Sequence, residues 1–121
     1  MRVRIPGAAA SPVAVDQKRT PRAWLRTSGG ATPSLDTSYG VTSITDAGVG
    51  QLDVTWTVAC ASGTSYAVVP TIFSSQVQQR VAFVSNATVP TATVARLVCN
   101  NTSAGNTTDP TSGFMCIMVG E

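Results

Sequence analysis

Residues 51 to 59 alternate between apolar and polar or small side chains with a period of two. Leu52, Val54, Trp56 and Val58 are each separated by a single residue. A strand places successive side chains on opposite faces, whereas a helix needs apolar residues three or four positions apart. The pattern therefore predicts a β-strand with one buried face, and it places Trp56, the largest apolar residue of the run, in the core.

Turn signals flank this strand on both sides. Asp46 and the glycines at 48 and 50 predict a tight turn. Glycine permits positive φ, and the Asp46 side chain can accept a hydrogen bond from the backbone two residues on. A β-branched run over residues 38–46 precedes this turn, and a second turn leads into a strand that starts at Tyr66. The stretch is therefore predicted to be a β-meander.

The later part of the chain predicts further strands separated by polar turns. Pro70 lacks an amide hydrogen and is typical of an edge strand. Turn signals recur at a spacing of about ten residues, which indicates an all-β, antiparallel β-sandwich of jelly-roll-like form. The six predicted strands cover residues 38–46, 52–59, 66–73, 80–85, 91–99 and 113–119.

The last of these strands, residues 113–119, is apolar on both faces. Such a strand lies either at the centre of a sandwich or with one face against a subunit partner. The alternation predicts Phe114, Cys116 and Met118 on one face and Met115, Ile117 and Val119 on the other. We expect an oligomer interface at this strand, formed by Phe114, Met115, Ile117 and Met118.

Residues 1–35 differ in composition from the rest. Four prolines and three glycines interrupt any long helix and favour extended conformations. Only residues 21–26 are predicted to form a helical turn, with Trp24 and Leu25 as a small apolar plug. The predicted domains are therefore an extended N-terminal arm over residues 1–35 and a β-sandwich domain over residues 36–121.

Charge is divided unevenly between these two parts. Residues 1–26 carry a net charge of +5, and the remainder carries −3. A basic arm of this kind either docks on an acidic protein surface or is a solvated, disordered tail. Nucleic acid is disfavoured because the arm has one aromatic residue and no dense basic run. If the arm attaches the protein to a partner, the expected attachment residues are Arg19, Arg22, Trp24, Leu25 and Arg26.

The composition of the chain and its lack of histidine argue against several classes of function. Only 12% of residues are charged, and 17 threonine and 12 serine residues suit strands that face water. No apolar run reaches the ~18 residues of a membrane span, and no signal-peptide core is present, so we expect neither membrane insertion nor export. Ser-His and Cys-His nucleophile pairs are excluded. We expect no enzyme activity, no metal and no cofactor.

The acidic and sulfur-containing residues have ordinary structural explanations. Asp46 and Asp109 lie in turn signatures, and Asp53 is expected to face solvent beside threonines. The spacing of Cys60, Cys99 and Cys116 fits no zinc site, and an odd count leaves one unpaired. In a reducing compartment these thiols are expected to be buried as small apolar residues.

Several of these motifs together resemble a known domain. The run Tyr39-Gly-Val-Thr-Ser-Ile-Thr-Asp46 is followed by Gly48-x-Gly50, Val54-Thr-Trp-Thr and Tyr66-Ala-Val-Val. With the ending Asn106-Thr-Thr-Asp-Pro-Thr-Ser112 and its apolar strand, residues 38–121 resemble a small β domain of tailed-bacteriophage tail fibres and other virion surface proteins. Trp56 stands where that domain usually has phenylalanine, and it seldom has cysteines.

The resemblance implies a non-enzymatic structural protein of a phage particle, assembled in the bacterial host cytoplasm. It would be a homo-oligomer, commonly a trimer, that serves as a fibre or capsid-decoration component beside other virion proteins. An alternative is a receptor-binding tail-fibre tip that recognises a bacterial surface glycan. The candidate receptor surface for that alternative comprises Tyr39, Tyr66, Asn101 and Asn106.

Overall fold

The computed structural model describes residues 20–73 and 80–121, and these ranges consist of strands, turns and loops without a helix. Accordingly, the described residues hold no helical segment of the length and apolarity that crossing a membrane requires. The strands are β2 (Pro21–Thr27), β3 (Leu35–Tyr39), β4 (Val41–Gly48), β5 (Gln51–Trp56), β6 (Tyr66–Phe73), β7 (Arg80–Val84), β8 (Val94–Asn101), β9 (Asn106–Thr107) and β10 (Gly113–Gly120).

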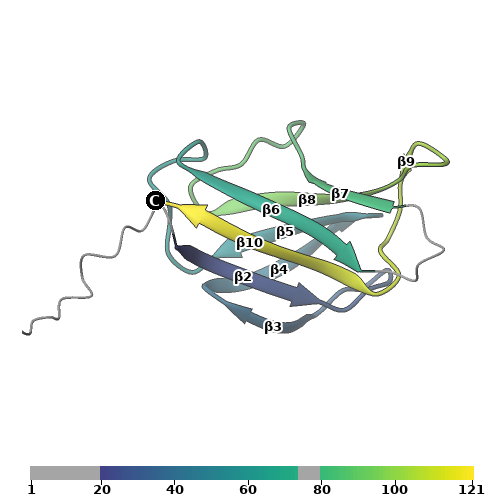
Figure 1. Ribbon diagram of the computed structural model, residues 1–121, viewed down its shortest axis with the longest axis horizontal. Helices are drawn as coiled ribbons and strands as arrows, with labels where there is room; N and C mark the ends of the chain where they lie inside the picture. The colour runs from purple at the N-terminus through teal and green to yellow at the C-terminus, as the bar shows by residue number, and fades with distance from the viewer. Residues whose placement is uncertain (1–19, 74–79) are drawn as a thin grey trace, which may run out of the picture.

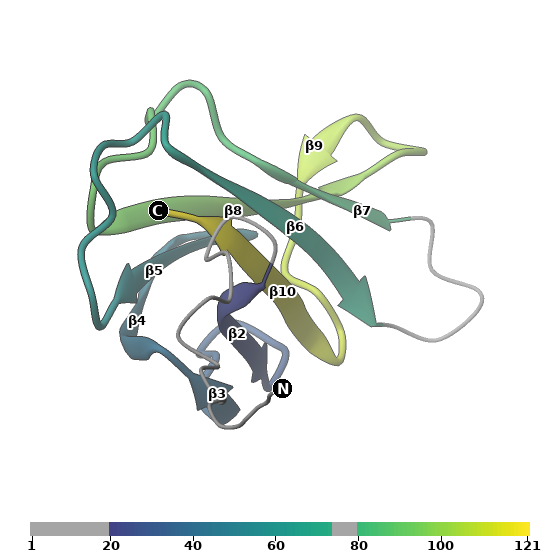
Figure 2. The ribbon, with the colours of Figure 1, turned by 60° about the vertical axis from the view of Figure 1, so that its left-hand side comes forward.

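Two antiparallel sheets pack against each other (Figures 1 and 2). The first sheet has the strand order β3-β2-β10-β6, and the second has the order β4-β5-β8-β7, with β9 paired to β8. The prediction of an all-β, antiparallel sandwich is confirmed. Strands from both ends of the chain, β2 and β10, form the centre of the first sheet.

Strand β5 shows the alternation that its sequence predicts. Leu52, Val54 and Trp56 are buried, whereas Gln51, Asp53 and Thr55 are half-buried on the other side. Trp56 is only 2% exposed, and its ring meets that of Tyr66 edge-on, with centroids 5.9 Å apart. The prediction that Trp56 lies in the core is therefore confirmed.

Strand β10 is central and has two different faces. Phe114, Cys116 and Met118 point into the core between the sheets, and Met115 and Ile117 point outward. The predicted division of this strand into two faces is confirmed. Phe114 and Met118 are each 1% exposed, so their assignment to an oligomer interface is wrong. Packing against the second sheet already occupies that face of the strand.

Strand β2 corrects the predicted domain boundary. Residues 21–27 form a strand between β3 and β10, not a helical turn in a separate arm. Ala23, Leu25 and Thr27 are buried in alternation with Trp24 and Arg26, a period of two that fits a strand. The sandwich therefore includes residues 20–35. The pattern of residues 21–26 is too short to distinguish a strand from a single helical turn by sequence alone.

The predicted turn and edge features are confirmed where the structure describes them. The Gly48 amide donates to Asp46 Oδ1 at 3.1 Å, and Gly48 and Gly50 have φ values of 141° and 68°. Pro70 lies in β6, the last strand in the order of the first sheet. The sequence did not predict β2, β3 or the short strand β9.

Candidate functional site

The outer face of the first sheet carries a row of large, exposed side chains. Tyr39 pairs with Trp24, Trp24 with Ile117, and Ile117 with Val69, so the row crosses all four strands. These side chains are 63%, 39%, 48% and 66% exposed, respectively. We call these four residues the apolar row. A contiguous exposed patch of this kind marks a surface that gains from being covered.

A groove of about 470 Å³ lies along the apolar row. Met115 of β10, Thr37 of β3 and Thr71 of β6 also line the groove. Arg26 is the one charged residue among those that line the groove. Its guanidinium carbon lies 4.3 Å from the centroid of the Phe73 ring, so this cation is stacked on an aromatic face.

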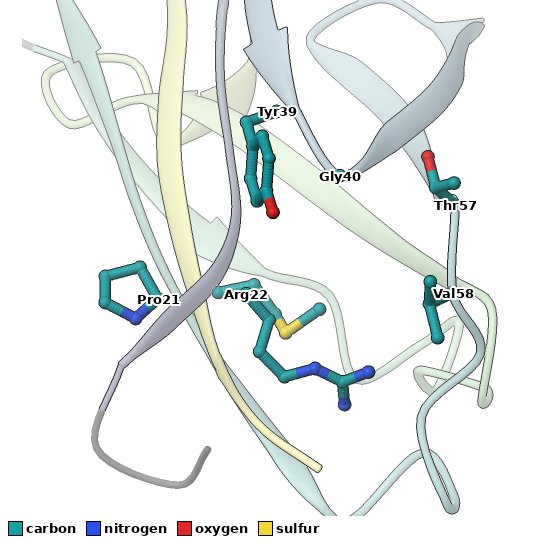
Figure 3. A pocket seen from close by; sticks show the side chains of 7 residues that line it. Pro21, Arg22, Tyr39, Gly40, Thr57 and Val58 are labelled. Atoms are coloured by element: carbon teal, nitrogen blue, oxygen red, sulfur yellow. The ribbon is translucent and has the colours of Figure 1, made fainter. Parts of the chain in front are cut away.

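A second hollow, the end cleft, lies where the first sheet meets the segment after β5. Its volume is about 410 Å³, and its walls include Arg22, Tyr39, Gly40, Thr57 and Val58 (Figure 3). The guanidinium of Arg22 extends from β2 toward Val58, and the Tyr39 hydroxyl points into the same space. The end cleft thus combines a cation, an aromatic ring and hydroxyl groups.

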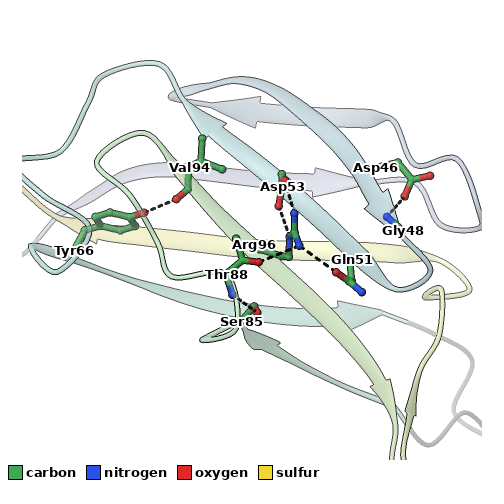
Figure 4. A network of polar contacts seen from close by, with 9 residues as sticks. All are labelled: Asp46, Gly48, Gln51, Asp53, Tyr66, Ser85, Thr88, Val94 and Arg96. Carbon is green, nitrogen blue, oxygen red and sulfur yellow. Dashed lines mark hydrogen bonds and ion pairs between the residues drawn. The ribbon is translucent and has the colours of Figure 1, made fainter.

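The outer face of the second sheet is polar at its centre. Arg96 donates to both carboxylate oxygens of Asp53, at 2.7 and 3.0 Å, and to Gln51 Oε1 and Thr88 Oγ1 (Figure 4). The hydrogen bond with Asp53 raises the pKa of Arg96 above its usual value. Asp53 is therefore paired with a cation, not simply solvated beside threonines as predicted. The two outer faces of the sandwich differ in chemistry.

The predicted attachment residues do not act as one unit. Leu25 is 2% exposed and belongs to the core, whereas Trp24 and Arg26 lie on the outer face. Arg22 lies at the end cleft, and Arg19 lies outside the described residues. Trp24 and Leu25 cannot form a joint plug because neighbouring residues of a strand point to opposite faces.

The predicted receptor residues divide between the two ends of the sandwich. Tyr39 ends β3 and Tyr66 begins β6, beside the C-terminal end of β10. Asn101 and Asn106 pair with each other in the β8–β9 hairpin, at the opposite end (Figure 1). The four side chains therefore do not form a single surface.

Two of these receptor residues have structural roles. The Tyr66 hydroxyl lies 2.8 Å from the Thr91 carbonyl oxygen, to which it donates. Asn101 Oδ1 accepts from the amides of Ser103 and Ala104, at 2.9 and 3.1 Å, and so caps the hairpin turn. Tyr39 and Asn106 remain exposed.

All three cysteines are free and buried, which confirms the prediction for their burial. Burial raises the pKa of each thiol, and for Cys116 it does so to about 12. The charge of Arg22 lowers the pKa of Cys60 and that of Arg80 lowers the pKa of Cys99, but burial is the larger effect in both. At neutral pH the thiols are protonated and behave as apolar groups.

Alkaline pH should destabilise the domain through Cys116. Its pKa rises from 9.0 to about 12 on folding, so above pH 9 the unfolded chain releases a proton that the folded protein keeps. This contribution to the free energy of unfolding is complete below pH 9 and should fall by about 1.4 kcal/mol per pH unit between pH 9 and 12. Urea unfolding under reducing conditions measures the slope. The Cys116→Ala variant should lack the part of the pH dependence that comes from this thiol. Equal slopes for the variant and the wild type would show that Cys116 is not its source.

No His, Cys, Asp or Glu side chains gather in groups of three or more that could hold a metal ion within residues 20–73 and 80–121. Comparisons of the chain with protein-family models, with curated proteins and with solved structures found no match. The candidate sites are therefore defined by geometry alone: the groove with its apolar row, and the end cleft.

Proposed function

We propose that this chain is a non-enzymatic structural protein of a tailed-bacteriophage particle, a homo-oligomeric fibre or decoration component. The observation that carries the proposal is the apolar row across the first sheet, with Trp24 and Ile117 at its centre. The resemblance of residues 38–121 to a virion surface domain supports a location in a phage particle. The apolar row supports assembly of the chain into a homo-oligomer. The trimer is the expected closed form.

The occupant of the groove is a second copy of this chain. Interface cores are enriched in aromatic residues and methionine and depleted in charge, which is the composition of this face. Each copy presents an exposed Trp24 and an apolar groove beside it. Trp24 of one copy can therefore pack into the groove of another copy, and the same contact can be repeated between all copies. Symmetric homo-oligomers are the commonest assemblies, and tryptophan dominates interface energetics.

The segment ahead of the sandwich anchors this oligomer to a neighbouring virion protein. Residues 1–19 contain Arg2, Arg4, Lys18 and Arg19 against a single acid, Asp16. Arginine and lysine favour an acidic protein surface as partner, and arginine adds forked hydrogen bonds to carboxylates. Strand β2 belongs to the fold, so the anchoring function falls to the residues before it.

The alternative, a tip that reads a host glycan, has less support. Its four candidate residues divide between the two ends of the sandwich, and two of them have structural hydrogen bonds. A single receptor surface made of all four is therefore not proposed.

Light scattering after size exclusion tests the oligomer. The full chain should elute as a multiple of its 12.5 kDa monomer. Ile117→Asp should give monomers, because it buries a charge in the centre of the interface. The matched control is Val81→Asp on the edge strand β7, since Val81 is 46% exposed and Ile117 is 48% exposed. A monomeric wild type, or equal behaviour of the two variants, would refute this interface.

Labelled particles test the virion assignment separately. Antibodies against the domain should decorate purified phage particles at regular positions, and deletion of residues 1–19 should remove the label while the isolated protein keeps its melting temperature. Unlabelled particles would exclude a virion role. Normal labelling of particles that carry the truncated chain would mean that the sandwich, and not residues 1–19, attaches the protein to the particle.

A further inference from the structure

Arg22 is the extra residue of a β-bulge at the end of β2. Met118 pairs with Ala23 and Val119 pairs with Pro21, so Arg22 has no partner on β10. A bulge redirects the side chain of its extra residue, and bulges are frequent beside binding sites. Here the result is that the guanidinium lies in the end cleft, unlike that of Arg26 on the same strand, which stacks on Phe73.

The guanidinium of Arg22 has spare hydrogen-bonding capacity among the described residues. Its Nη1 atom lies 3.9 Å from Cys60 Sγ, a weak acceptor whose thiol is protonated. Within residues 20–73 and 80–121, no carboxylate lies within ion-pair distance of Arg22, in contrast to Arg96 with Asp53. An arginine presents five donors in a fixed fork that matches a carboxylate.

The residues that line the end cleft opposite Arg22 suit a sugar ring. The Tyr39 side chain is 63% exposed at the mouth of the cleft. Thr57 Oγ1 accepts from Thr42 Oγ1 at 3.3 Å and is turned away from Arg22, whereas the Tyr39 hydroxyl points into the cleft (Figure 3). Gly40 holds the wall close to β2, since it has a φ of +71° and a Cβ there would lie 2.5 Å from the Arg22 carbonyl oxygen.

We infer that the end cleft binds an acidic sugar residue, a pyranose ring that carries a carboxylate, as part of a polysaccharide. The carboxylate pairs with the Arg22 fork, and one face of the ring stacks on Tyr39. Tyr39 ends the apolar row, but it lines the end cleft and not the groove that the second copy occupies. The site is therefore separate from the groove, and it extends the proposed function to a ligand.

An NMR titration of the ¹⁵N-labelled full chain tests this inference. The probes are the trisaccharide of galacturonic acid, the neutral galactose trisaccharide and sodium acetate. We expect a Kd on the order of 1 mM for the acidic trisaccharide, with shifts at residues around the end cleft. The neutral sugar and acetate should each bind at least about tenfold more weakly, because each lacks one of the two recognised groups.

Matched variants assign the binding to the end cleft. Arg22→Gln should weaken the binding of the acidic trisaccharide about tenfold or more, and Tyr39→Ala should weaken it severalfold. Arg22→Lys, which keeps the charge but not the fork, should lie between wild type and Arg22→Gln. Arg26→Gln removes the same charge from the same strand and should leave binding unchanged.

Four results would overturn the inference. Three of them are the absence of shifts with the acidic trisaccharide, equal affinity for the neutral trisaccharide, and equal losses in Arg22→Gln and Arg26→Gln. Binding of acetate as tightly as the acidic trisaccharide would also overturn it, since the cleft would then hold a simple anion.

Discussion

Trp56→Ala is expected to remove a large share of the domain's stability and to lower its melting temperature sharply. Trp56 is 2% exposed and packs in the shared core against Tyr66. Truncation of a buried tryptophan costs about 3–5 kcal/mol, and small domains have only about 5–15 kcal/mol of stability. Circular dichroism of the purified variant should show a broad, early transition or none. A cooperative melt near that of the wild type would contradict the role of Trp56 in the core.

Two control variants test whether the loss comes from the buried position of Trp56 and from the volume of its side chain. Trp24→Ala removes the same side chain from the outer face, where it is 39% exposed, and should cost far less in the stability of the fold. Trp56→Phe should be tolerated better than Trp56→Ala. Phenylalanine keeps an aromatic ring in the core beside Tyr66, so it leaves a smaller cavity than alanine does.

Gly113→Ala is expected to cost about 3 kcal/mol or more of stability. Gly113 begins β10 with a φ of 134°, and a Cβ there would lie 1.9 Å from the Thr27 carbonyl oxygen. The clash is with backbone, so β2 and β10 must separate to relieve it. That separation strains the buried hydrogen bond in which the Phe114 amide donates to Thr27 Oγ1, at 3.0 Å.

Gly48→Ala is the matched control for this substitution. Gly48 has a φ of 141°, close to that of Gly113, but an added Cβ there meets nothing within 4 Å. It should show only the backbone strain, about 1 kcal/mol. Chemical denaturation of both variants measures the difference. Similar losses in the two would mean that the approach of β2 to β10 is not what requires glycine at position 113.

The N-terminal boundary changes how truncations should be designed. Removing residues 1–35 deletes β2 from the centre of the first sheet, between β3 and β10. Its buried side chains Ala23, Leu25 and Thr27 would leave the core with it. Loss of particle attachment in such a variant would report unfolding, so only a deletion that ends at residue 19 separates anchoring from stability.

Features that depend on neighbouring residues could be predicted from the sequence. The alternation in β5 predicted the burial of Trp56, the Asp46–Gly50 run predicted its turn, and β10 showed its two faces. These features follow from side-chain alternation and from the backbone freedom of glycine, both of which act over a few residues. The sandwich class followed from their repetition along the chain.

Which residues cover each face, and which side chains meet, became known only from the pairing and packing of the strands. Sequence showed that β10 has two apolar faces, but not that Phe114 and Met118 pack inside while Ile117 joins Trp24 on the outside. The strand character of β2 was likewise settled by its pairing with β3 and β10. The apolar row and the end cleft unite residues from distant parts of the chain. Their positions depend on strand order, register and one bulge, which arise from long-range pairing and leave no periodic signal in the sequence.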